Sequence, residues 1–69
     1  MKYEFILKIK HSVSDSFHEK FHCKVEEKQY FAVKTDYENY LAQHKNEFFD
    51  SVILINKLDD NGEFVEIIQ

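Results

Sequence analysis

One strong turn signal constrains this chain more than any other feature of its sequence. The 69 residues include one glycine and no proline, and the glycine ends the run Asp59-Asp60-Asn61-Gly62. Asn-Gly pairs tolerate the positive φ angles of tight turns between antiparallel strands. The flanking segments, 51–58 and 63–68, are rich in the β-branched residues that favour strands. We therefore predict a C-terminal β-hairpin.

The N-terminal third has the two-residue period of strands. Apolar residues occupy every second position from Tyr3 to Ile9, and the polar run 11–16 then ends the alternation. A second strand follows over 17–25, where Glu19 alone breaks the apolar face; a helix there is the alternative. Residues 26–34 favour a third strand by the propensities of Tyr30, Phe31 and Val33, with a short helix as the alternative.

A helix is predicted from Thr35 to about residues 45–49. In the run Thr35-Asp36-Tyr37-Glu38, the threonine and glutamate side chains can satisfy each other's backbone amides, as in a capping box. The residues that follow place an apolar stripe on one helix face at spacings of three and four. They are Tyr37, Tyr40, Leu41, His44 and Phe48.

These elements predict a single α+β domain over residues 1–69. Its order is β-β-(β)-α-β-β, with one helix packed on one face of an antiparallel or mixed sheet. A helix of about twelve residues spans only roughly 18 Å and cannot cover five strands. Some of the apolar residues Ile6, Phe31, Ile53, Ile55 and Phe64 must therefore stay uncovered, unless the sheet curls around the helix or another chain shares the surface.

No constellation of side chains in the sequence points to catalysis, and we expect no enzyme. The one glycine is used in the hairpin, so no phosphate-binding loop exists. His18 and His22 have zinc-like spacing on a helix, but on a strand they stand roughly 13 Å apart, too far to share an ion. We therefore predict no metal site and no cofactor, and we assign Cys23 to the core.

The single cysteine also excludes an internal disulfide and indicates a reducing compartment. The first residues lack the apolar region of a signal peptide, and the longest aliphatic run is too short to cross a bilayer. The expected location is the cytoplasm, or the host cell cytoplasm if a phage encodes the chain.

Charge is divided unevenly between the two halves. Residues 1–34 carry a net charge of +2, whereas residues 35–69 carry −6, for a total of −4. Acidic side chains beside exposed tyrosines can dock onto a basic groove, with charge steering the encounter. The predicted partner contacts are Asp36, Tyr37, Tyr40, Glu47, Asp50, Asp59, Asp60 and Glu63.

The function expected from these features is that of a small binding protein, a stoichiometric inhibitor or adaptor that occupies a basic, nucleic-acid-handling protein. The chain contains no family motif. Its size, its richness in Lys, Asn, Ile, Phe and Tyr, and its lack of catalytic groups resemble small phage accessory proteins, including anti-CRISPR-type inhibitors. The resemblance is one of overall character and transfers no residue.

Two alternatives remain open. Lysines on the N-terminal strands could bind single-stranded nucleic acid, with His18 and His22 between them. The lysines are Lys8, Lys10, Lys20, Lys24 and Lys28. The net negative charge and the absence of arginine argue against this partner. The other alternative is a structural homodimer that covers the remaining apolar surface.

Overall fold

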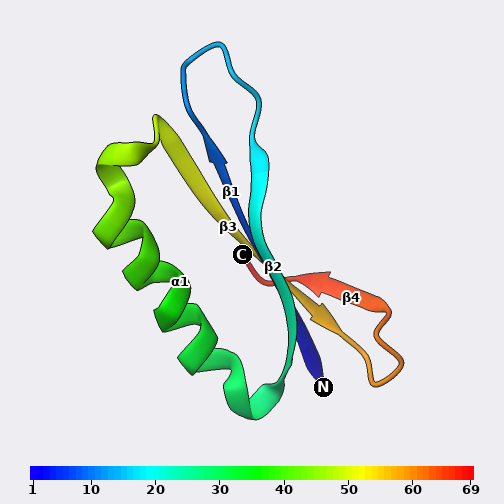
Figure 1. The fold of residues 1–69 in the computed structure, drawn as a ribbon. Helices are drawn as coiled ribbons and strands as arrows, with labels where there is room; N and C mark the ends of the chain where they lie inside the picture. The colour runs from blue at the N-terminus through cyan, green and yellow to red at the C-terminus, as the bar shows by residue number, and fades with distance from the viewer.

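A computed structural model describes all 69 residues as one four-stranded antiparallel sheet with one α-helix (Figure 1). The sheet order is β2-β1-β3-β4. In chain order, the elements are β1 (Lys2–Lys10), β2 (His18–Glu26), the 3-10 turn η1 (Glu27–Gln29), α1 (Tyr30–His44), the 3-10 turn η2 (Lys45–Glu47), β3 (Asp50–Leu58) and β4 (Phe64–Ile67). The α+β class, the single helix and the C-terminal hairpin are therefore confirmed. No helix has the length and apolar character needed to cross a membrane.

β1 is one of the two interior strands, between β2 and β3, and its alternating pattern explains the core. Phe5 lies opposite Cys23 of β2 on one side and Ile55 of β3 on the other. Because directly paired residues point to the same face, the apolar positions of all three strands meet beneath α1. The buried core comprises Phe5, Leu7, Ile9, Tyr37, Ile53 and Ile55.

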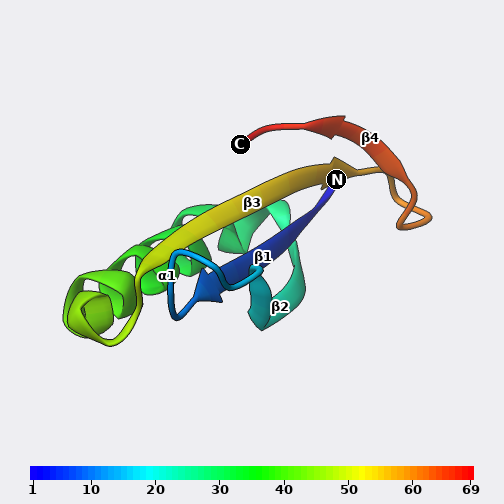
Figure 2. The same ribbon diagram turned by 90° about the horizontal axis from the view of Figure 1, so that it is seen from above.

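The helix follows the long direction of the sheet and leaves the hairpin outside its reach. Figure 2 shows α1 along one face of the sheet, while the β3–β4 hairpin extends beyond it at the other end. As expected from helix length, coverage of the sheet is partial: Ile53 and Ile55 are buried, whereas Phe64 of β4 is exposed. Phe31 is exposed too, but on α1 itself rather than on a strand.

For residues 26–34 the helix alternative is confirmed and the third strand is wrong. Residues 27–29 form η1, and α1 begins at Tyr30 rather than at Thr35. The amide oxygen of Gln29 accepts a hydrogen bond from the backbone N–H of Glu26 at 3.2 Å, which secures the entry to the helix. Tyr30 and Val33 pack against the core and extend the helical stripe toward its N-terminus, so packing overrides their strand propensity.

A β-bulge explains why Glu19 interrupts the alternation of β2. Leu7 pairs with Phe21, but the next residue, Lys8, pairs with Glu19, so Lys20 is an extra residue in the ladder. The insertion moves Glu19 to the face opposite α1, next to Lys8. The acidic residue therefore does not enter the core.

Candidate interaction surfaces

The predicted acidic contacts lie in separate places rather than on one surface. Asp36 is on the solvent side of α1, and Glu47 and Asp50 lie around the start of β3. The other three acids, Asp59, Asp60 and Glu63, follow the opposite end of that strand. Nine residues of β3 separate the two groups by about 26 Å. A single compact partner site therefore cannot use all the predicted acids equally.

The expectation that Tyr37 is exposed is wrong. The side chain is part of the core, with its ring centroid 5.6 Å from that of Phe5. Its hydroxyl lies 3.2 Å from the Sγ atom of Cys23, which packs against the core as predicted. Burial, reinforced by the contact with Cys23, raises the pKa of Tyr37. Tyr37 therefore belongs to the apolar stripe of α1 that packs on the sheet, and it is not available to a partner.

Tyr40 is half-buried and belongs to an aromatic row on α1. Its ring lies 4.8 Å from the ring of Phe21 in an edge contact and 4.3 Å from the imidazole of His44 in a stacked one. His44 in turn hydrogen-bonds to Glu47. This row connects the helix to β2, so only the outer part of Tyr40 is available for a partner.

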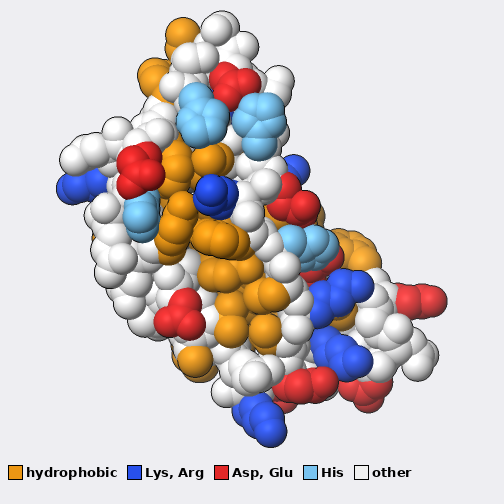
Figure 3. All heavy atoms as spheres, viewed as in Figure 1, with side chains coloured by type: hydrophobic (Ala, Val, Ile, Leu, Met, Phe, Trp, Pro, Cys, Tyr) orange, Lys and Arg blue, Asp and Glu red, His pale blue; other side chains and the backbone are white.

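Hydrophobic side chains reach the surface along the junction of α1 and β2. Figure 3 shows them as a continuous strip between the helix and this strand. Phe21 is 40% exposed there, with the Nζ atom of Lys20 at 6.0 Å from its ring centroid. Because β2 is an edge strand, the strip lies next to an unpaired strand edge.

At the hairpin tip, Asp59 has a structural role. Its Oδ1 atom accepts hydrogen bonds from the backbone N–H groups of Asn61 and Glu63, both at 2.9 Å. Gly62 completes the turn with a φ of 82°, as its sequence context predicts. Asp60, by contrast, has a side chain that is 92% exposed, with the amino group of Met1 at 3.2 Å. Asp60 and Glu63 are therefore the accessible acids of the tip.

Large apolar residues accompany these acids on β4. Phe64 and Ile67 are 60% and 69% exposed, and Val65 is also exposed. Glu66 lies between them in the sequence, but it pairs with Lys57 and faces the α1 side of the sheet, whereas Phe64 and Ile67 pair with Leu58 and Asn56 and face the other side. Glu66 is exposed and contacts Lys57 weakly, at 4.0 Å. We call this combination of acidic and apolar side chains on an edge strand the hairpin surface. It comprises Asp60, Glu63, Phe64, Val65, Glu66 and Ile67.

The face of the sheet opposite α1 carries charges of both signs. His22 contacts Glu4 at 2.6 Å and Glu19 at 3.2 Å. The side-chain amide of Asn56 donates a hydrogen bond to Glu4 at 3.1 Å, and this bond is the main reason that the pKa of Glu4 is lowered. Carboxylates therefore interrupt the lysine and histidine surface on which nucleic-acid binding would depend.

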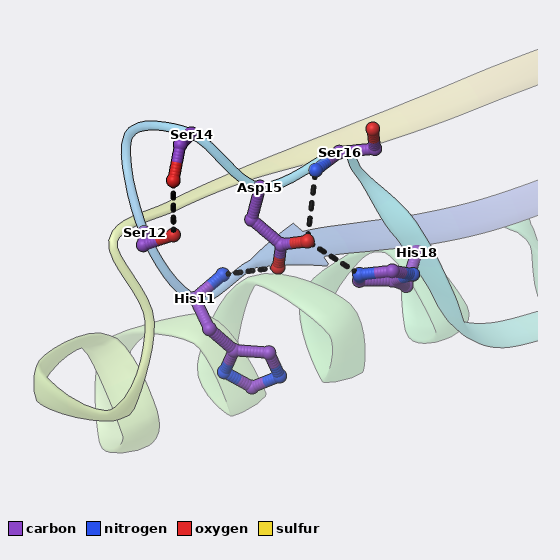
Figure 4. Close-up of polar contacts among 6 residues, drawn as sticks. All are labelled: His11, Ser12, Ser14, Asp15, Ser16 and His18. Atoms are coloured by element: carbon purple, nitrogen blue, oxygen red, sulfur yellow. Dashed lines mark hydrogen bonds and ion pairs between the residues drawn. The ribbon is translucent and has the colours of Figure 1, made fainter.

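The polar loop between β1 and β2 is organised by one carboxylate. Asp15 accepts hydrogen bonds from the backbone N–H groups of His11 and Ser16, and it contacts the Nε2 atom of His18 at 3.0 Å (Figure 4). The His11 bond is the largest of the effects that lower the pKa of Asp15 to about 2. Figure 4 shows that the loop serines do not bind either imidazole.

The remaining features are the absence of a metal-binding group and the presence of one pocket. No three His, Cys, Asp or Glu side chains are grouped so as to hold a metal ion. A pocket of about 210 Å³ lies near the start of α1, lined by Tyr3, Glu27, Tyr30, Phe31 and Ile68. Sequence reasoning missed this pocket, although adjacent aromatic residues at Tyr30 and Phe31 were a signal for it.

Comparison with known proteins gives no relative of this chain. No protein-family model, no curated protein and no solved structure matches it.

Proposed function

We propose that this chain is a non-enzymatic binding protein, a stoichiometric inhibitor or adaptor, that docks the hairpin surface onto a basic protein. The observation that carries the proposal is the exposure of Phe64, Val65 and Ile67 on an edge strand that also carries Glu66 on its other face and follows the acidic tip with Asp60 and Glu63. Apolar residues exposed together on a small domain are typical of an interface, and the acids around them favour a basic partner.

The position of the hairpin supports this choice over the other acidic group. The hairpin extends beyond α1 and presents both its tip and its edge strand (Figure 2). Around Glu47 and Asp50, Glu47 is bound to His44, Asp50 accepts a hydrogen bond from the N–H of Ser51, and the exposed aromatic residue between them, Phe49, already has the Nζ atom of Lys10 5.4 Å from its ring centroid. With one cysteine and no disulfide, we place the action in the reducing cytoplasm, of a host cell if a phage encodes the chain.

The test compares two charge reversals of equal size. One variant carries Asp60→Lys, Glu63→Lys and Glu66→Lys; the matched control carries Asp36→Lys, Glu47→Lys and Asp50→Lys. Asp59 is left unchanged because its carboxylate holds the turn. The partner is identified by capture from extracts of the source cells with mass spectrometry, and its affinity for each purified variant is measured by calorimetry at two salt concentrations.

We expect the hairpin variant to bind about ten-fold more weakly, since three exposed ion pairs contribute about 0.5 kcal/mol each. Its binding should also depend less on salt than that of the unmodified protein. The control should retain its affinity. Equal affinity for the hairpin variant and the unmodified protein would refute the proposal, and weakening by the control alone would move the interface to the start of β3.

A homodimer is the second candidate, and the strip along α1 and β2 favours it. Phe21 is exposed beside an unpaired strand edge, so a second copy could cover the strip and extend the sheet. Light scattering distinguishes the two functions. A dimer gives a mass that rises with concentration without any foreign protein, and Phe21→Lys should return it to the monomer mass.

A further inference from the structure

The pocket near the start of α1 has an unusual lining for so small a domain. Its walls come from three segments that are distant in the sequence: Tyr3 of β1, Glu27 to Phe31 at the start of the helix, and Ile68 after β4. Its volume of about 210 Å³ is below the roughly 300–1,000 Å³ typical of small-molecule sites. The size suits one inserted side chain better than a cofactor.

The aromatic rings of the pocket stand at steep angles to one another. The ring centroids of Tyr3 and Tyr30 are 4.8 Å apart with an interplanar angle of 65°. Those of Tyr30 and Phe31 are 5.2 Å apart at 87°. Rings at these distances pack edge-to-face against one another, and the ring faces that stay uncovered are electron-rich and attract cations.

The charge of the lining is also suited to a cation. Glu27 is exposed and supplies the only carboxylate, and no basic residue lines the pocket. Lys57 lies opposite Tyr3 in the strand register, yet it does not line the pocket. Its ammonium group contacts the carboxylate of Glu66 at 4.0 Å. Elsewhere the chain already places an ammonium group over rings: the Nζ atom of Lys10 lies 5.2 Å from the ring of Phe17.

We propose that this pocket receives the side chain of a lysine from the partner protein. The apolar stem would pack against Ile68 and the rings, while the ammonium group would meet the ring faces and the Glu27 carboxylate. The inference rests on the proposed function for the source of the lysine. Ile68 of the pocket directly follows Ile67 of the hairpin surface, and Glu66 of that surface shares the α1 side of the sheet with Tyr3, so one basic partner can contact both.

The experiment uses a small probe and does not require the partner. The isotope-labelled protein is titrated with Nα-acetyl-lysine methylamide and, separately, with Nα-acetyl-norleucine methylamide, which has a similar stem without the ammonium group. Chemical shifts of the pocket residues report binding by NMR. The variants are Glu27→Gln and Phe31→Leu, and Glu38→Gln, an exposed helix residue outside the pocket, is the matched control.

We expect the lysine probe to shift the pocket resonances and to bind about five-fold more tightly than the norleucine probe. Glu27→Gln and Phe31→Leu should each weaken it about three-fold, and Glu38→Gln should not change it. Phe31 is 76% exposed, so its replacement leaves the fold intact. Equal binding of both probes, binding of neither, or insensitivity to Glu27→Gln would overturn the inference. If the triple charge reversal of the hairpin surface left the affinity for the partner unchanged, while the lysine probe still bound the pocket, only the proposed interface would be refuted.

Discussion

Replacing Phe5 by Leu tests the packing argument most directly, because the cost can be worked out from the contacts. Phe5 is completely buried, and its ring lies 5.4 Å from that of Tyr30 and 5.6 Å from that of Tyr37. Each aromatic pair is worth about 0.5–1.5 kcal/mol beyond the area that it buries. Leucine keeps most of that area, so we expect a loss of about 2 kcal/mol in the free energy of unfolding.

The matched control is Phe31→Leu, which makes the same chemical change at a site that is 76% exposed. It removes one contact, with Tyr30 at 5.2 Å, and should cost about 0.5 kcal/mol or less. A domain of this size has about 3–10 kcal/mol of stability, so both variants should remain folded.

Urea denaturation followed by far-ultraviolet circular dichroism measures both losses. With a slope of roughly 1 kcal/mol per molar urea, Phe5→Leu should lower the midpoint by about 2 M and leave the slope unchanged. Similar midpoints for the two variants would show that the core is not centred on Phe5, and the reasoning would fail.

Three further predictions concern single side chains. Because the pKa of Tyr37 is raised above its ordinary value near 10, the protein should lose stability as the pH rises beyond 10; Tyr37→Phe should remove that part of the loss in alkaline urea titrations. The lowered pKa of Asp15, about 2, implies the opposite dependence. Asp15→Asn should destabilise the protein at pH 7, and its unfolding curve should approach that of the unmodified protein as the pH falls to about 2. Gly62→Ala should cost about 1 kcal/mol in thermal unfolding, entirely from its φ of 82°, because the added Cβ would meet no atom within 4 Å. Gly62→Asn should cost less, since asparagine tolerates positive φ.

The parts of the fold that follow from local period were predictable from the sequence. The alternation around Phe5 indicated β1, and Asn61-Gly62 indicated the hairpin; both are confirmed. The start of α1 was not predictable from propensity, because Tyr30 and Val33 favour strands in isolation and become helical through packing on the core. The helical stripe itself contained the evidence against an exposed Tyr37.

The sites were less predictable than the fold, for a physical reason. Charge along the chain does not show that β3 separates the acids around Asp50 from those around Asp60. The pocket was hidden because Tyr3 and Ile68 lie at opposite ends of the sequence and meet only in the folded sheet. Interaction surfaces built from distant segments require the topology to be known first.

The position of β1 between β2 and β3 has a consequence for how the protein is made. Its partner β2 follows after a short loop, but β3 pairs with it only across 40 to 56 residues, from Lys10 with Asp50 to Lys2 with Leu58. During synthesis, the apolar side of β1 therefore emerges long before the strand that completes its burial. Contacts between such distant residues slow folding, so the β1–β2 hairpin must stay unaggregated while the rest of the chain is translated.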